Sequence, residues 1–105
     1  MFNHVGHLTL SAEATDEQVE AILTGLLGLP GQIDGLIEAH VVRDAGLTEG
    51  NATLRFHMRF DSPESWRAYG QHPAHVAVVK EHVAPVLAAK NFVQYDDADV
   101  RTATA

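Results

Sequence analysis

Residues 52–60 alternate strictly between apolar and polar side chains. A period of two is typical of a β-strand that buries one face and exposes the other. Ala52, Leu54, Phe56, Met58 and Phe60 are expected on the apolar face, and Thr53, Arg55, His57 and Arg59 on the polar one. Because antiparallel sheets can expose one face to water, this segment predicts a strand of such a sheet, covered on one side only.

Less regular alternation predicts three further strands, at residues 3–10, 37–43 and 91–95. Between the first two, Thr15 and Gln18 have the spacing of a capping box, and a helix is expected from there to about residue 28. Its core face carries Val19, Ile22, Leu23 and Leu26. Leu29-Pro30-Gly31 then breaks the helix.

The second half of the chain predicts two more helices. Ser62-Pro63-Glu64 begins the first, with a cap, a proline and an acid in order, and Gly70 can end it. Pro73 begins the second, which should bend or stop near Pro85. The order strand–helix–strand–strand–helix–strand predicts an α+β, ferredoxin-like βαββαβ fold, with helices on one face of a four-stranded antiparallel sheet.

Composition limits the classes of protein that this chain can represent. Its 105 residues fit a single domain, 1–105, with an ordered core over about 2–96 and Asp96, Asp97 and Asp99 in a solvated tail. The absence of cysteine excludes disulfides and thiol nucleophiles. With a net charge of −7 and seven Lys and Arg residues, no nucleic-acid partner is expected. No signal-peptide pattern and no apolar run of ~20 residues is present, which predicts a cytoplasmic protein without a membrane span.

One short run, Tyr69-Gly70-Gln71-His72-Pro73-Ala74-His75, holds three side chains that can exchange protons. With Pro73 at the first helical position, His72 falls at the cap and His75 in the first turn, while Tyr69 closes the preceding helix. These groups could move protons at neutral pH without a cofactor. The same residues could instead form a corner held by hydrogen bonds, and His72 in particular is expected to accept from backbone N–H groups.

A metal site is a further alternative, since His72, His75 and His82 lie near one another in the sequence. Zinc sites need three or four convergent ligands, and no HExxH pattern or well-placed carboxylate accompanies these histidines. We therefore expect no metal, and we expect His82 on the surface.

Several of these segments together resemble the stress-responsive α/β-barrel (Dabb) family. The likeness covers about residues 2–96 and is carried by His4, Leu29-Pro30-Gly31, Phe60-Asp61, Tyr69 to Val76, and Phe92 to Asp96. The resemblance implies a homodimer in which two ferredoxin-like sheets pack face to face and close an α/β barrel, with the helices outside.

The resemblance also implies a possible chemistry. A plant member of the family is a polyketide cyclase, which closes a linear chain by an intramolecular aldol reaction, and its tyrosine and histidine match Tyr69 and His75 here. A further pocket histidine matches His4. In two places the chain departs from that enzyme, with Leu54 in place of a histidine and Leu26 in place of a tyrosine, so a more apolar pocket is expected.

The resulting hypothesis is a cofactor-free, cyclase-like protein that binds an aromatic or polyketide-like molecule between sheet and helices. His75 is the candidate base, Tyr69 the orienting acid and His4 an auxiliary. The candidate ligand-binding residues are Leu26, Leu54, Trp66 and His72. Two alternatives remain: a non-catalytic, stress-related binding or structural homodimer, and, by fold analogy alone, a cofactor-free monooxygenase.

The polar face of the third strand can be read in two ways. Arg55, His57 and Arg59 could face solvent, or they could lie in a dimer interface, where buried charges need partners such as Glu38. The sequence leaves this choice open.

Overall fold

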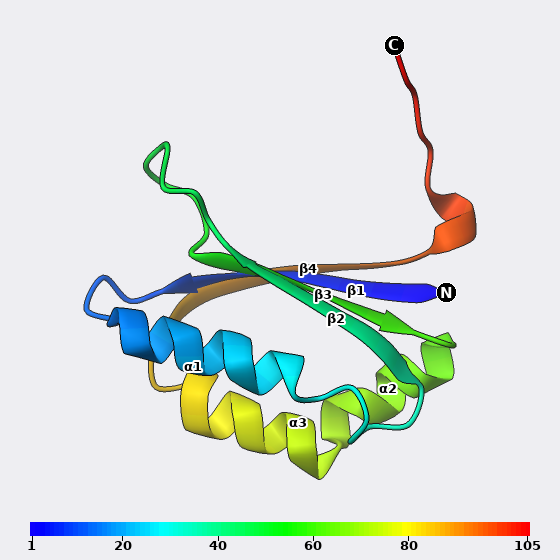
Figure 1. Cartoon of the computed structure of the whole chain (residues 1–105), viewed down its shortest axis with the longest axis horizontal. Helices are drawn as coiled ribbons and strands as arrows, with labels where there is room; N and C mark the ends of the chain where they lie inside the picture. The colour runs from blue at the N-terminus through cyan, green and yellow to red at the C-terminus, as the bar shows by residue number, and fades with distance from the viewer.

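The strands of the chain form one antiparallel sheet, and its three α-helices lie on the same side of it (Figure 1). The computed structural model describes residues 1–105. Its main elements are β1 (Phe2–Leu10), α1 (Asp16–Leu27), β2 (Leu36–Arg43), β3 (Leu54–Phe60), α2 (Pro63–Gln71), α3 (Pro73–Val78) and β4 (Leu87–Asp96). The strand order is β2-β3-β1-β4, with every neighbouring pair antiparallel. The predicted ferredoxin-like fold is confirmed.

Alternation along the strands decides which side chains reach the core. The apolar side chains of β3 point toward the helices, and Met58 and Phe60 are completely buried there. Ile22 of α1 meets them from the helical layer in the same core cluster. The opposite face of the sheet carries polar residues and has no helix over it (Figure 1).

Local sequence signals set most of the element ends. The predicted capping box is present, because Thr15 Oγ1 accepts from Gln18 N at 3.2 Å and Gln18 Oε1 accepts from Thr15 N at 2.9 Å. Ser62 caps α2 through the N–H of Ser65. Helix α3 begins at Pro73 as predicted and continues as a π-helical turn, Val79–Val83, that ends before Pro85.

Two strand boundaries differ from the sequence prediction by more than one residue. Strand β3 begins at Leu54 rather than at residue 52. Strand β4 begins at Leu87 rather than at 91, because it pairs with the whole of β1 as far as Leu10. The alternation along β4 is weak because it is an edge strand that is largely exposed on both faces, so its first residues carry little apolar signal.

The outer face of the sheet holds an ion-pair network that the sequence predicted in part. Arg59 contacts Glu38, the expected partner, at 3.6 Å, and it also contacts Asp97 at 2.7 Å. Asp97 accepts a hydrogen bond from Asn3 as well, at 2.7 Å. Asp97 is exposed, as expected, but its carboxylate is held by Arg59 and Asn3, because antiparallel pairing with β1 returns the end of β4 to the start of the chain.

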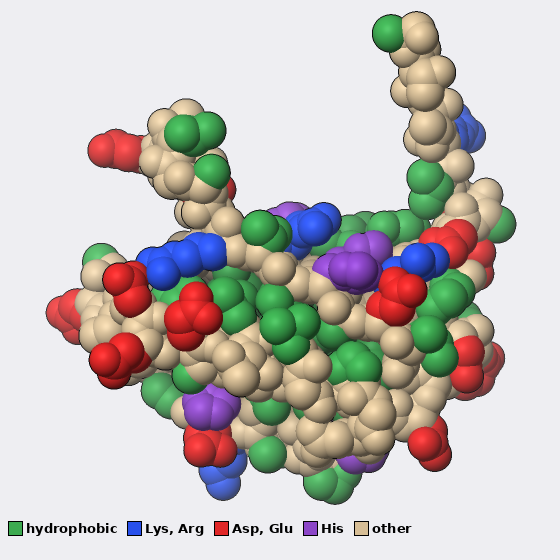
Figure 2. Space-filling model, in the orientation of Figure 1, with side chains coloured by type: hydrophobic (Ala, Val, Ile, Leu, Met, Phe, Trp, Pro, Cys, Tyr) green, Lys and Arg blue, Asp and Glu red, His purple; other side chains and the backbone are tan.

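Two segments project from this outer side at opposite ends of the sheet (Figure 1). One is the β2–β3 connection, with Leu47 near its tip at 87% exposure, and the other is the chain after β4. Figure 2 shows His, Lys or Arg, and hydrophobic side chains together along the sheet between these projections. On the other side of the molecule, none of the helices combines the length and the apolar character that would let it cross a membrane.

Replacing a core residue of α1 should cost far more than replacing an exposed one. We expect Ile22→Ala to lower the free energy of unfolding by about 3 kcal/mol, because Ile22 is 0% exposed and a cavity would remain. Leu27→Ala, on the same helix at 52% exposure, should change it by less than about 0.5 kcal/mol. Urea unfolding of both variants measures the difference, and equal losses would contradict this packing.

Candidate active site

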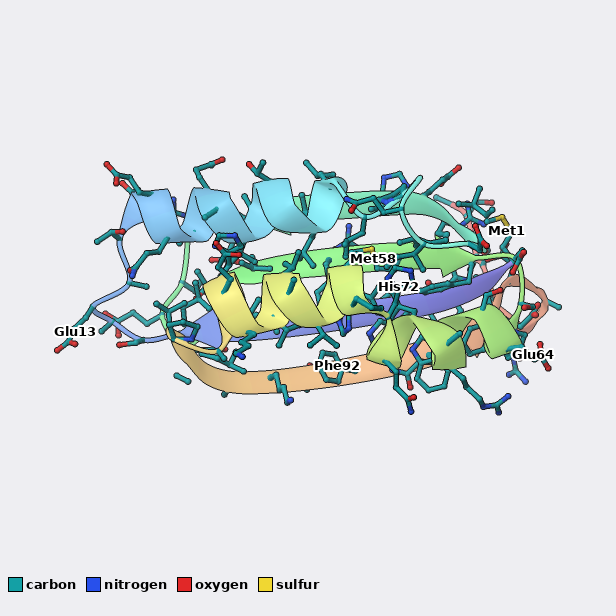
Figure 3. The ribbon with its side chains drawn as sticks, turned by 90° about the horizontal axis from the view of Figure 1, so that it is seen from below. Met1, Glu13, Met58, Glu64, His72 and Phe92 are labelled. Atoms are coloured by element: carbon teal, nitrogen blue, oxygen red, sulfur yellow. The ribbon has the colours of Figure 1, made fainter.

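A cavity of about 600 Å³ lies between the sheet and the helices. That volume is in the range of small-molecule sites, about 300–1,000 Å³. Its wall is mostly apolar and draws residues from β1, β3, β4 and all three helices, among them Leu26, Phe56, Trp66 and Phe92. Phe92 lies on β4, beyond the edge of the helical layer, and is 45% exposed (Figure 3). The cavity therefore opens toward the edge strand.

His75 lines this cavity as a neutral imidazole with a defined tautomer. Its Nδ1 is 3.2 Å from the carbonyl oxygen of Gly70. A carbonyl can only accept, so Nδ1 carries the proton and Nε2 keeps its lone pair. Burial lowers the pKa of His75 below its ordinary value, and nearby His72 lowers it further, against the opposing effect of the Gly70 carbonyl. At neutral pH, His75 is thus a neutral ring whose Nε2 can accept a proton or a hydrogen bond.

Tyr69 lies directly beside His75, with ring centroids 4.1 Å apart. The ring of Tyr69 is buried against Phe60, and burial raises the pKa of its phenol, which stays protonated. The hydroxyl takes part in none of the side-chain hydrogen bonds of the chain. It also retains some accessible surface, since Arg59 Nε is the one buried side-chain polar atom without a partner. The phenolic proton is therefore not donated to any side-chain acceptor of the chain.

His4 enters the cavity from β1 and has the opposite tautomer. The amide nitrogen of Gln94 donates to His4 Nδ1 at 2.8 Å, so the ring proton of His4 is on Nε2. Aromatic rings surround it, with centroid distances of 5.1 Å to Phe56 and 5.3 Å to Phe92. Burial, and to a smaller extent His75, lowers the pKa of His4 to about 4. His4 is accordingly a neutral N–H donor.

Gly6 makes room for this arrangement of rings. A Cβ atom at Gly6 would lie 2.2 Å from the ring of Phe56 and 2.7 Å from that of Phe92. Both rings therefore rest on the bare backbone of β1, one position along the inner face from His4. No sequence pattern predicted the need for glycine at this position, because the rings that require it come from two other strands.

The structure brings together five of the seven residues that the sequence nominated for the site. His4, Leu26, Trp66, Tyr69 and His75 all line the cavity. Leu54 does not, because its side chain is packed in the core at 1% exposure. His72 also lies outside the cavity wall and caps α3, accepting from Ala74 N at 3.1 Å, which is the structural role expected for it.

Other wall residues were missed by the sequence analysis. Gln94, which fixes the tautomer of His4, and Lys90 lie on β4, and Arg67 and Gln71 lie on α2. Lys90 fell outside the strand predicted at 91–95, although its spacing from Phe92 and Gln94 places all three on one face of β4. As for a metal, no three His, Cys, Asp or Glu side chains lie together in a way that could hold one.

Fold and cavity together define a ferredoxin-like domain with a partly apolar cavity between sheet and helices. The model of the Stress Responsive A/B Barrel Domain (Dabb) family matches residues 2–97, and the chain belongs to that family. Comparison with curated protein sequences gives no match.

Solved structures agree with this assignment. A dimeric ferredoxin-like protein of unknown function from Thermobifida fusca is 32% identical, with 90% of this chain and 88% of that one covered and a TM-score of 0.79. A protein from Arabidopsis thaliana is 24% identical, with 97% and 100% covered and a TM-score of 0.80. A hydroxynitrile lyase from Passiflora edulis is 14% identical over 96% of each chain, with a TM-score of 0.80. At such identities the last two show the fold alone.

Acid should destabilise the protein in part through His4. Its pKa is about 4 when folded and 6.5 in the unfolded chain, so the unfolded state binds more protons between these values. The stability contributed by neutral His4 is thus fully present above pH 6.5 and is lost as the pH falls toward 4. We expect a loss of about 2 kcal/mol between about pH 7 and pH 5 from this residue.

Urea unfolding at several pH values measures this effect, with His4→Gln as the comparison because that variant cannot titrate. The wild type should lose more stability on acidification than the variant does. Parallel pH profiles for the two proteins would show that His4 is not held neutral by the fold.

Proposed function

We propose that the cavity binds a small aromatic or polyketide-like carbonyl compound and catalyses its enolisation, as a polyketide cyclase does in an aldol ring closure. The observation that carries this proposal is the combination, in one cavity of about 600 Å³, of a neutral imidazole with a free lone pair and two neutral donors. The acceptor is Nε2 of His75, and the donors are the Tyr69 hydroxyl and His4 Nε2–H.

The chemistry follows from these protonation states. His75 Nε2 takes a proton from the carbon next to a carbonyl group, and the Gly70 carbonyl, which accepts from Nδ1–H, stabilises the imidazolium that forms. The enolate oxygen accepts hydrogen bonds from Tyr69 or His4, which are neutral donors in an apolar wall where such bonds are strong. The enolate carbon then attacks a second carbonyl of the same molecule, forming a carbon–carbon bond, and His75 returns its proton to the new alkoxide. No cofactor is required.

A second candidate function is binding without chemistry. It is favoured by the absence of a hydrogen bond between Tyr69 and His75, whose rings are instead tilted by 38° with their centroids 4.1 Å apart. In that case the chain would be a stress-related carrier or structural homodimer. A cofactor-free monooxygenase rests on fold analogy alone, and a cytoplasmic location rests on the sequence alone.

Enolisation can be tested with a simple ketone that carries an aromatic ring. We expect the protein to accelerate exchange of the benzylic hydrogens of phenylacetone for deuterium in D₂O, followed by proton NMR. His75→Gln should slow this exchange by at least roughly 100-fold, because the base is lost. Tyr69→Phe should slow it by roughly 100-fold through loss of a donor to the enolate. His82→Gln, which replaces a histidine outside the cavity wall, should leave it unchanged.

The pH profile distinguishes His75 from a solvent-exposed base. Since the pKa of His75 is lowered, the exchange rate should rise with pH through a value below 6.5 and be flat above it. Phenylacetone that binds, by saturation-transfer NMR, without any exchange above the buffer rate would favour the binding function instead.

We further propose that the chain forms a homodimer through the outer face of its sheet. Three observations support this. Arg59 Nε is buried there without a partner, exposed Val42 and Val93 lie on this face, and the two projections flank it. The similar protein from Thermobifida fusca is dimeric. A second sheet packed against this one would close the barrel.

Acid should weaken such a dimer. Burial lowers the pKa of His57, as do Arg55, His40 and Arg59, while Asp97 opposes them. Protonation on acidification would thus add positive charge beside two arginines in the interface. Sedimentation from about pH 8 to pH 5.5 should find the dimer constant weakened by roughly tenfold.

His57→Gln provides the matched variant for this measurement. Its amide can still donate to the Asn3 oxygen, which is 2.8 Å from His57 Nε2, but it cannot become charged. The variant should flatten the pH dependence of dimerisation, whereas a wild-type dimer constant that is the same at both ends of the series would refute the proposal.

A further inference from the structure

The wall of the cavity is positively charged, in contrast to the rest of the chain. It includes Arg67 and Lys90 and none of the 14 Asp and Glu residues of this protein, whose net charge is −7. The three ion pairs that involve a lysine or arginine belong to Arg43 and Arg59, so both wall cations are without an anionic partner. The histidines of the wall are neutral, as described above.

Both cations lie at the rim of the cavity. Their side chains are exposed, while the aromatic wall behind them is buried or half-buried. Arg67 comes from α2, next to Trp66, and Lys90 comes from β4, with its ammonium 5.7 Å from the centroid of the Phe92 ring. The rim therefore offers positive charge from two elements, α2 and β4.

The register of β4 connects this rim to the interior. Lys90 is opposite Leu8 on β1, Phe92 is opposite Gly6, and Gln94 is opposite His4. Along one face of one strand, a cation is thus followed by an aromatic ring and then by the amide that fixes the tautomer of His4. A molecule lying along this row would meet positive charge at one end and the proposed proton-transfer groups at the other.

We propose that the molecule bound in this cavity is an amphipathic organic acid, with an aromatic or aliphatic body inside and an anionic group held at the rim by Arg67 and Lys90. This inference rests on the proposed function, because it names the chemical class of the ligand of that site. A neutral ligand would leave both exposed cations in water and gain nothing from their charge. An anion pairs with them and is drawn locally to a protein that otherwise repels it.

Two dyes with the same body test the head group. 1-Anilinonaphthalene-8-sulfonate and N-phenyl-1-naphthylamine share one aromatic skeleton. The first carries a sulfonate on it, and the second is uncharged. Trp66 is the single tryptophan of the chain and lines the cavity, so quenching of its emission reports binding there. The measurement is the ratio of the two dissociation constants in low-salt buffer.

The double variant Arg67→Gln with Lys90→Gln should lower the preference for the sulfonate by roughly fivefold to tenfold, the size of two solvent-exposed ion pairs. Its affinity for the neutral dye should change by less than about twofold. The control is Lys80→Gln with Arg101→Gln, which removes the same charge from residues outside the cavity wall and should leave the ratio unchanged. Added salt should weaken the sulfonate alone.

The outcomes separate this inference from the function on which it rests. A ratio that is the same in the wild type and the rim variant, or that falls equally in the control, overturns the anionic head group while leaving a binding cavity. Failure of both dyes to quench Trp66 overturns the binding function and this inference together.

Discussion

The apolar side chains on the inner face of β1 and β3 are buried beneath the helices, and the arrangement of the site depends on this contact. Met58, Phe60 and Ile22 are fully enclosed there. At its margin the helical layer leaves Phe92 of β4 45% exposed (Figure 3). The layer that stabilises the fold thus also leaves a cavity at its margin, bounded by the core on one side and an edge strand on the other.

The same packing determines which ring nitrogens in the cavity carry a proton. His4 and His75 are neutral because burial disfavours their charged forms, and each is held in one tautomer by a partner from the fold itself. Gly70, in the last turn of α2, accepts from one ring, and Gln94 on β4 donates to the other. One histidine therefore presents a lone pair and the other an N–H, which is a division of roles that two free histidines in water would not have.

The two faces of the sheet differ in character. The inner face supplies an apolar cavity with a small number of neutral polar atoms and a cationic rim. The outer face concentrates charge, with Arg59 placed between Glu38 and Asp97, and is flanked by the two projecting segments (Figures 1 and 2). Because strands alternate, His4 and Asn3 are neighbours in sequence yet belong to these separate environments.

Features that depend on neighbouring residues were predictable from the sequence. Local patterns predicted the alternation of β3, the capping box at Thr15 and the cap at His72. Together these patterns also predicted the fold and the proximity of Tyr69 to His75. Features that depend on residues far apart in the chain became visible in the fold alone. Leu54 is enclosed by the core instead of lining the cavity, Asp97 returns to Arg59, and Gln94 sets the tautomer of His4. Each of these results from strand register, which places residues up to 94 positions apart in contact and leaves no local pattern from which to predict it.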